Sequence, residues 1–346
     1  MRTKKKILVA PLNWGLGHAS RCIPIIDQLQ KSAFTPVIAS DGVALELLKK
    51  EFPELEYLEL PAYKISYGKN LKWALLQNLP HILRTVKKEW ELIKKYVDSN
   101  PETVGIISDN RFGCHSKNLP SVYITHQLQV FSGFSSPITT FFHQQIIKKF
   151  DECWIPDQEN SLFSGNLSKS SSHLRQKYIG ILSRFQRKKV PQHIDALIVL
   201  SGPEPNRSQL EMTLRTVLKS NLKKIWLIQG VIEKSQKIIQ DGNLTIVNFM
   251  LSKELECALN SSKIVVCRAG YSSIMDLVFL NKKAVLIPTK HQNEQEYLAK
   301  YLQKKGYFSF VEEGAIHEKI LDQRIESKHM PVGKLFEDNG TLFDLF

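Results

Sequence analysis

The segment PLNWGLGHASR, residues 11–21, places two glycines and a histidine directly after a short apolar run. Gly15 and Gly17 remove side chains where the backbone must turn sharply or approach a ligand. His18 follows at the expected start of a helix, and a neutral imidazole is a competent general base. We therefore predict a ligand-facing loop with His18 as catalytic base, the alternative being an ordinary turn with a solvated histidine. Ser20 stands where a dinucleotide fingerprint would have its third glycine, so that motif is not supported.

A second segment of this kind is CRAGYSSIMD, residues 267–276. Gly270, Ser272 and Ser273 lie where an apolar run turns into a helical pattern, and backbone N–H groups and hydroxyls there suit a diphosphate. Asp276 comes one helical turn later, where a carboxylate could accept hydrogen bonds from ribose hydroxyls. The alternative is a serine N-cap followed by an ordinary surface acid.

Two further polar loops follow apolar runs, at residues 201–207 and 288–296. The first could hold a phosphate or merely turn the chain. The second has the dense neutral donors and acceptors that suit sugar hydroxyls, the alternative being a polar helix start with Asn293 as its N-cap. The residues of interest are Gly202 and Arg207 in the first loop and His291, Gln292 and Gln295 in the second. The run TVGIISD, residues 103–109, is a further apolar strand, and Asp109 stands at its carboxyl end.

Alternating strand and helix patterns must position these loops. In the first half, apolar strands at 6–10, 35–40, 103–109 and 120–127 alternate with helical spacing, most clearly over 79–97. The alternation restarts near residue 195 with strands at 224–230, 263–270 and 283–289, among others. Such alternation is typical of a parallel sheet covered by helices, with ligands at the carboxyl ends of the strands.

The chain is therefore expected to form two tandem α/β domains. We predict a Rossmann-like domain over residues 1–180, a second over 190–322, and a tail over 323–346. The 346 residues suit two domains.

Composition narrows the class of partner and the compartment. The formal net charge of +13 favours an anionic partner, although a merely basic soluble protein would have the same balance. Five widely spaced cysteines without a CxxC pair argue against a disulfide framework and a structural zinc site, which favours the cytoplasm. No signal peptide or membrane-spanning run is expected. The lysines are scattered over several helices, so we expect no nucleic-acid partner.

The sequence resembles glycosyltransferase family 28, over roughly residues 5–310. The family's first loop ends in Gly-His, as GLGH at 15–18 does. Its nucleotide-sugar signature is similar to the residues Arg268, Gly270, Ser272, Asp276, Pro288, His291 and Gln295. Asp276 and Glu296 stand where the family usually has Glu and Gln.

The resemblance implies a GT-B fold, in which two Rossmann-like domains with parallel sheets face each other across a cleft. It implies inverting transfer of a hexose or N-acetylhexosamine from a UDP-sugar, with UDP-GlcNAc favoured, to a lipid, lipid-linked or glycan acceptor. It further implies donor binding by the second domain, acceptor binding by the first, and no metal or other cofactor. His18, or alternatively Asp109, would take the proton from the acceptor hydroxyl.

The segment 64–88 combines basic and apolar residues, so part of the positive charge could serve to bind a membrane surface. It mixes Lys64, Lys69, Lys72 and Arg84 with Trp73, Leu75, Leu76 and Leu79. If exposed, this face would dock on anionic lipid at the inner face of the cell membrane; if buried, it is an ordinary amphipathic helix. Two other functions stay open: a UDP-sugar hydrolase or epimerase of the same fold, and a non-catalytic nucleotide-sugar-binding subunit.

Overall fold

The computed structural model describes residues 5–63, 71–131, 133, 136–169, 173–322, 328–336 and 341–346, without the side chains of 71–78. It divides into two compact units. Unit 1 comprises Met1–Trp14, His18–Leu182 and Gly333–Phe346, and unit 2 comprises Gly15–Gly17 and Ser183–Val332. Each unit is described by itself.

Unit 1 is built on a seven-stranded sheet in the order β3-β2-β1-β4-β5-β6-β7, in which all pairs are parallel. The strands are β1 (Lys6–Pro11), β2 (Thr35–Ser40), β3 (Glu56–Glu59), β4 (Thr103–Asp109), β5 (Ser121–Ile124), β6 (Glu152–Ile155) and β7 (Gln176–Tyr178). The helices are α1 (Gly17–Lys31), α2 (Gly42–Glu51), α3 (Leu71–Ser99), α4 (Ser136–Ile147) and the short η2 (Gly165–Ser168).

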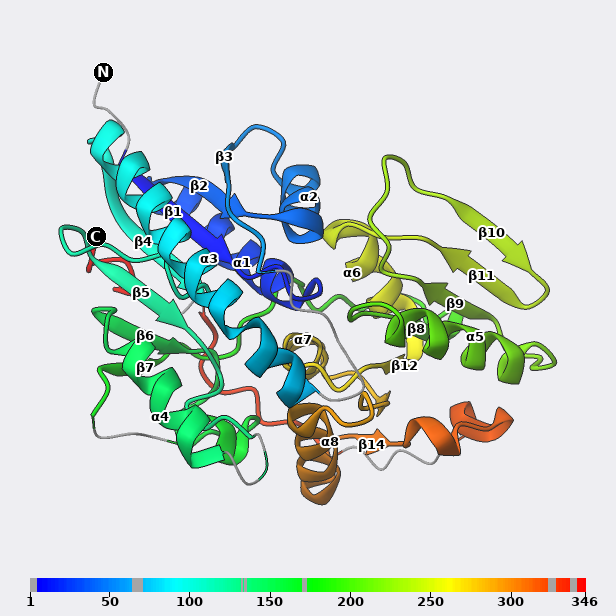
Figure 1. Ribbon diagram of the computed structural model, residues 1–346. Coiled ribbons are helices and arrows are strands. Elements are labelled where there is room, and N and C mark those ends of the chain that lie inside the picture. The colour runs from blue at the N-terminus through cyan, green and yellow to red at the C-terminus, as the bar shows by residue number, and fades with distance from the viewer. Residues whose placement is uncertain are drawn as a thin grey trace. The chain divides into compact units, whose positions relative to one another are not determined.

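The apolar strands of unit 1 are buried because helices cover the sheet. Helix α3 runs along one face (Figure 1), where its Ile93 packs with Leu8, Val37 and Ile106 from three neighbouring strands. Burying each such side chain contributes about 1.5–3 kcal/mol. The predicted strands at 6–10, 35–40 and 103–109 are thereby confirmed, whereas α4 was not predicted.

Unit 2 has a second seven-stranded sheet, in the order β10-β11-β9-β8-β12-β13-β14. Its strands are β8 (Ile194–Val199), β9 (Ile225–Ile228), β10 (Ile238–Asp241), β11 (Leu244–Val247), β12 (Ser262–Cys267), β13 (Ala284–Leu286) and β14 (Ser309–Phe310). Its helices are α5 (Asn206–Leu218), α6 (Ser252–Ser261), α7 (Tyr271–Leu280) and α8 (Asn293–Lys305), with short turns η3 (Glu313–Ala315) and η4 (Glu318–Asp322). The edge strand β10 pairs antiparallel with β11, while the other pairs are parallel.

The segment Gly333–Phe346 returns to unit 1 after unit 2 is complete. The backbone of Ile181 exchanges hydrogen bonds of 3.0 Å with Lys334 and Phe336. The Phe343 ring packs against Phe34 and Trp154. A part of what we predicted as a tail is thus built into the first unit.

The fold prediction of two α/β units with parallel sheets is confirmed. In both sheets the strand order reverses beside the first strand, between β1 and β4 and between β8 and β12. In doubly wound folds, ligands bind at this point, outside the carboxyl ends of the strands.

Candidate active site

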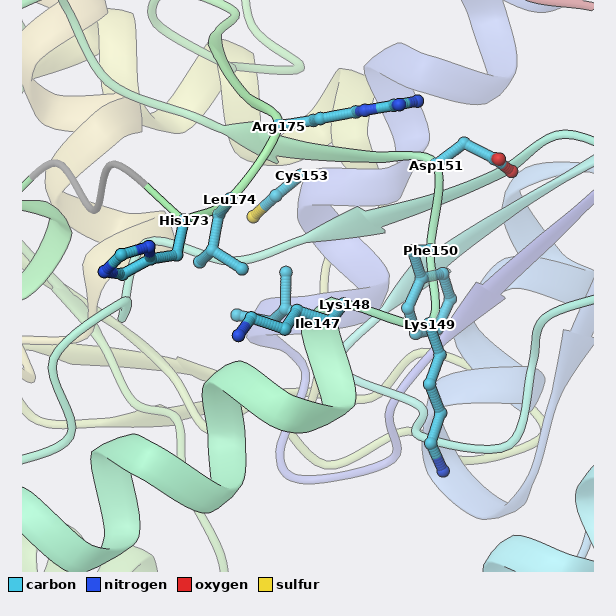
Figure 2. Close-up of a pocket in the computed structure, with 9 residues that line it drawn as sticks. All are labelled: Ile147, Lys148, Lys149, Phe150, Asp151, Cys153, His173, Leu174 and Arg175. Atoms are coloured by element: carbon cyan, nitrogen blue, oxygen red, sulfur yellow. The ribbon is translucent and has the colours of Figure 1, made fainter.

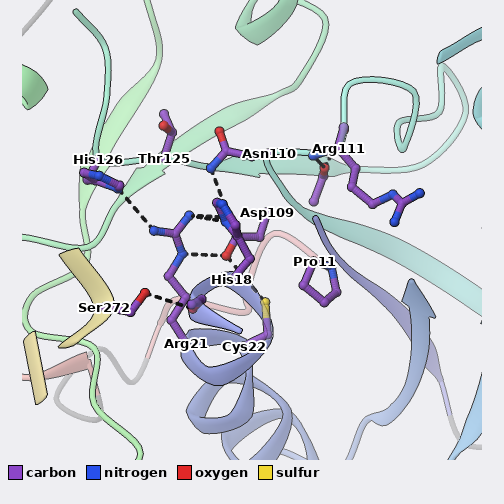
Figure 3. Close-up of polar contacts among 12 residues, drawn as sticks. Pro11, His18, Arg21, Cys22, Asp109, Asn110, Arg111, Thr125, His126 and Ser272 are labelled. Carbon is purple, nitrogen blue, oxygen red and sulfur yellow. Dashed lines mark hydrogen bonds and ion pairs between the residues drawn. The ribbon is translucent and has the colours of Figure 1, made fainter. Parts of the chain in front are cut away.

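Three neighbouring strands of unit 1 bring the first candidate residues together. His18 lies at the start of α1 after β1, Asp109 is the last residue of β4, and His126 follows β5. These strands lie side by side in parallel. His18 Nδ1 lies 2.9 Å from Asp109 Oδ1 (Figure 3). Both predicted proton acceptors therefore belong to one site, as a pair rather than as alternatives.

Asp109 is fully buried and held as an anion. Arg21, one turn after His18 on α1, donates from Nε to Asp109 Oδ2 at 2.5 Å and from Nη2 to Oδ1. Burial alone would raise the pKa of Asp109, but the Arg21 charge and the bonds from Arg21 and His18 hold it well below its usual range. The carboxylate thus orients His18 without itself being available as a base near neutral pH.

The loop after β4 is fixed from behind. Asn110 has a positive φ of 58°, which asparagine tolerates, and donates to Asp109 Oδ1 at 3.2 Å. The buried Arg111 binds Glu89 at 2.5 Å and Asp41 at 2.6 Å. These bonds tie the loop to α3 and to the start of α2, so Asp109 has little freedom to move.

His18 itself remains accessible. It lies at the start of α1, and its side chain is 18% exposed while Asp109 is not exposed at all. Gly15 has a positive φ of 71°, which is the turn that the sequence predicted. Gly17 begins α1.

Sequence reasoning missed Arg21 and His126. Arg21 follows His18 by three residues, which puts it on the same helix face, and a buried arginine in an apolar helix normally has a charged partner. His126 closes a predicted strand, as Asp109 does. Its Nδ1 lies 3.1 Å from Arg21 Nη1.

In unit 2 the candidate loops also follow neighbouring parallel strands, here β8, β12 and β13. Gly270 is the N-cap residue of α7, and Ser272 and Ser273 lie in its first turn. Backbone N–H groups at this position can bind an anion. A Cβ built at Gly270 meets no atom within 4 Å, so space is open beside it.

Asp276 lies one turn further along α7. Its Oδ1 accepts a 2.7 Å hydrogen bond from Ser183 Oγ. Burial raises the pKa of Asp276 to about 6, against the opposing effects of the Arg184 charge and of hydrogen bonds from Ser183 and the Arg184 backbone. The Asp276 carboxylate thus already accepts hydrogen bonds from Ser183 and from the Arg184 backbone. Ribose binding by Asp276 stays a prediction.

The two predicted donor-site arginines are engaged within unit 2. All five N–H donors of Arg207 have partners, which are Glu204, Ser208, Glu211 and the Gln229 carbonyl. Arg268 is buried and binds Glu313 and the carbonyl of Asn206. In this arrangement both guanidinium groups hold loops together.

The loop before α8 is likewise fastened by its own side chains. Gln295 Oε1 accepts bonds from Thr289 N and Oγ1 at 2.9 and 3.1 Å, and Glu296 accepts from His291 N at 2.8 Å. Gln292 is the N-cap residue of α8. Gly202 has φ +103°, a conformation open to glycine. Hydrogen bonds within these loops therefore hold them at the carboxyl ends of the strands. Their contacts with a sugar stay a prediction.

A pocket of about 340 Å³ lies in unit 1, away from His18 and Asp109. Its rim includes Lys148, Lys149 and Arg175, but Figure 2 shows the Lys149 and Arg175 side chains pointing away from each other. No common binding point results, and we place the candidate site at the strand ends instead. Among the described residues, no group of three or more His, Cys, Asp or Glu side chains is arranged to hold a metal ion.

Part of the chain is similar to a known protein family. The glycosyltransferase family 28 C-terminal domain matches residues 209–340. That portion of the chain is thus similar to the C-terminal domain of this family. The match includes the segments 267–276 and 288–296.

Relatives extend the resemblance to most of the chain. The UDP-N-acetylglucosamine–N-acetylmuramyl-(pentapeptide) pyrophosphoryl-undecaprenol N-acetylglucosamine transferase of Caldanaerobacter subterraneus is 22% identical, covering 90% of this chain and 87% of the relative. The enzyme of the same name from Sulfurihydrogenibium is 21% identical, covering 93% and 89%. The resemblance to a family 28 glycosyltransferase is confirmed.

Solved structures show the same fold. SnogD, a glycosyltransferase from Streptomyces nogalater, has a TM-score of 0.63 at 12% identity, covering 93% of this chain and 92% of its own. MurG of Acinetobacter baumannii has 0.51 at 15% identity, covering 93% and 89%. A putative UDP-N-acetylglucosamine 2-epimerase from Listeria monocytogenes has 0.62 at 11% identity, covering 97% and 94%. The predicted GT-B architecture is confirmed, and the epimerase shows that the fold alone does not choose the reaction.

Proposed function

We propose that this protein is an inverting glycosyltransferase that moves a sugar from a UDP-sugar, with UDP-GlcNAc the first choice, to a lipid-linked or glycan acceptor. The observation that carries the proposal is the His18–Asp109 pair, a base and its orienting carboxylate joined at 2.9 Å. The family 28 domain in the second half supports a nucleotide-sugar donor. The relatives' name supports a lipid-linked acceptor.

The proposed reaction is a single displacement. His18 Nε2 removes the proton from the acceptor hydroxyl while that oxygen attacks the anomeric carbon. The bond from this carbon to the diphosphate oxygen breaks, and UDP leaves with the bonding electron pair. Attack from the face opposite the leaving group inverts the anomeric configuration, and Asp109 stabilises the imidazolium that forms.

The leaving diphosphate needs stabilisation as its charge develops. The start of α7 offers backbone N–H groups and the hydroxyl of Ser273 for this purpose. The predicted Ser272 hydroxyl donates instead to the Gly17 carbonyl at 2.8 Å, so its contact with the diphosphate would require this bond to break. Asp276 would accept hydrogen bonds from the ribose. We propose that these groups suffice without a metal ion, so that EDTA leaves turnover unchanged.

Unit 1 also exposes large apolar side chains that suit a lipid surface. On α3 the side chains of Leu79 and Leu83 are 47% and 61% exposed, and Arg84 beside them is exposed as well. On α4 the same holds for Ile138, Phe141 and Phe142. Lys64 and Lys69 lie outside the described residues, as do the side chains of Lys72, Trp73, Leu75 and Leu76.

No described helix is long and apolar enough to cross a membrane. We therefore propose peripheral docking of α3 and α4 on anionic lipid at the cytoplasmic face of the cell membrane, where a lipid-linked acceptor would be met. Vesicles with anionic lipid should co-sediment with the wild-type protein. A Leu83→Glu/Phe141→Glu double variant should stay in the supernatant, and equal sedimentation of both would refute the docking surface.

Thermal stabilisation of the purified protein by UDP, UDP-GlcNAc, UDP-Glc, UDP-Gal, GDP-mannose and NAD tests the donor. A ligand at about 100 times its Kd stabilises the folded state by about 2.7 kcal/mol. We expect a rise in Tm with uridine ligands that Asp276→Ala abolishes. A flat response to every uridine ligand would overturn the proposal.

The second candidate is a UDP-sugar epimerase or hydrolase, which the fold likeness to the Listeria protein favours. Incubation with UDP-GlcNAc separates the reactions. A transferase releases UDP only when acceptor is present, whereas a hydrolase releases UDP in its absence and an epimerase changes the sugar without releasing UDP. A non-catalytic binding subunit would bind the donor and turn over under none of these conditions.

A further inference from the structure

Arg21 makes contacts in three directions from one guanidinium. It is buried at the first turns of α1 and meets the carboxylate of Asp109 from β4. Its Nη1 also lies 3.1 Å from His126 Nδ1, in the loop after β5 (Figure 3). Its Nη2 lies 3.0 Å from His18 Nδ1. One charged group therefore touches both histidines of the site.

The contact with His126 determines where that ring carries its proton. A guanidinium has five N–H donors and no acceptor. His126 Nδ1 must therefore accept the hydrogen bond from Arg21, which requires it to be unprotonated. The neutral ring then has its proton on Nε2.

The contact with Asp109 places the proton of His18 on the other ring nitrogen, Nδ1. An ionised carboxylate only accepts hydrogen bonds, so His18 Nδ1, at 2.9 Å from Oδ1, must carry a proton. Arg21 Nη2 also donates to Asp109 Oδ1. Because the two nitrogens donate to the same oxygen, they lie only 3.0 Å apart. The lone pair of His18 is thus on Nε2.

We propose that Arg21 is a positioning residue that sets opposite tautomers on the two histidines and thereby decides which of them is the base. His18 presents a lone pair at Nε2, and His126 has a proton at the same ring position. A hydroxyl can lose its proton to His18 Nε2 but not to His126 Nε2. The use of this difference in catalysis rests on the proposed function, whereas the proton positions themselves do not.

Arginine is needed for this role because of its shape. Its planar fork binds both oxygens of Asp109 through Nε and Nη2 while Nη1 points to His126. A lysine at the same place keeps the charge beside Asp109 but has no rigid fork. Arg21→Lys therefore separates charge from geometry.

The test is nitrogen NMR of the full chain without substrate. With the ten histidines labelled with ¹⁵N, chemical shifts report which ring nitrogen is protonated. His18→Gln and His126→Gln variants assign the two signals. At a pH where both rings are neutral, we expect a proton on Nδ1 of His18 and on Nε2 of His126. The same tautomer on both rings, or the reverse assignment, would overturn the proposal, and the wild-type protein alone decides this.

The Arg21→Lys variant tests the cause. We expect His126 to become a mixture of tautomers and kcat to fall at least tenfold, while the Kd for UDP stays within twofold. Arg175→Lys, an exposed arginine of unit 1, is the matched control and should change neither. Unchanged tautomers and unchanged kcat in Arg21→Lys would show that Arg21 does not set them. If the tautomers behave as expected but no turnover is found with any sugar donor, the proposed function fails and the inference stands.

Discussion

The two units have the same sheet topology at the site but fill the strand ends with different chemistry. In unit 1 the ends of β1, β4 and β5 bring together ionisable side chains, with a buried Asp109 whose charge is matched by Arg21. In unit 2 the ends of β8, β12 and β13 present glycines, hydroxyls and the start of α7, while the charged side chains hold the loops. Under the proposed function, unit 1 handles the proton and unit 2 binds the nucleotide. Single substitutions test this division of roles.

Replacing His18 should have the largest effect. His18→Gln removes the base, and loss of a general base lowers rates by about 10²–10⁴-fold. We expect kcat to fall in this range while the Kd for UDP changes less than twofold, as measured by turnover and calorimetric titration. A variant that loses UDP binding as well would show that His18 also serves the donor.

Asp109→Asn should come next, with a fall in kcat on the order of 10²-fold. An asparagine amide can donate to His18 Nδ1, which moves the proton to Nε2 and removes the lone pair there. The variant also leaves Arg21 with less compensating charge, so its Tm should be lower than that of the wild type. Circular dichroism establishes that it is folded, and full activity in the folded variant would refute the orienting role.

Asp276 should make the free energy of unfolding depend on pH. Its folded pKa of about 6 exceeds the ordinary value of 3.8, so the folded chain holds the proton more tightly than the unfolded chain. The contribution of Asp276 to the free energy of unfolding is then highest at pH values below 3.8. It falls as the pH rises from 3.8 to about 6. The loss is on the order of 2–3 kcal/mol.

Asp276→Asn does not titrate. Calorimetry from pH 4 to pH 7 should therefore show the variant gaining stability relative to the wild type by roughly that amount. A difference between the two proteins that does not change with pH would mean that the carboxylate is better solvated than its environment indicates.

Arg207→Gln should have the smallest effect on the donor. Since all five N–H donors of Arg207 already have partners in unit 2, we expect a lower Tm and a change of less than twofold in the Kd for UDP. A tenfold weaker Kd would instead support the diphosphate contact predicted from the sequence, and would require the loop to rearrange when UDP binds.

Periodicity was enough to predict two α/β units with parallel sheets, with Asp109 at the end of a strand and His18 at the start of a helix. Apolar runs such as 103–109 are buried on both faces, which makes them easy to recognise. The sequence could not say that His18 and Asp109 are partners, because their contact spans 91 residues and depends on β1 lying beside β4. It also could not show that Arg207 and Arg268 spend their donors on nearby carboxylates and carbonyls. Tertiary packing determines which arginine or lysine is available to a ligand, and the spacing of residues in the sequence does not reveal this.

The segment Gly333–Phe346 has a consequence for how the protein is made. A ribosome adds this segment only after all of unit 2, yet it completes unit 1 by packing Phe343 on Phe34 and Trp154. Gly105 also leaves room for the ring of Phe346, which a Cβ at that position would meet at 2.1 Å. During synthesis, the unit that is translated first is therefore completed last, and the apolar side chains that Phe343 packs against stay uncovered until the second unit has been made.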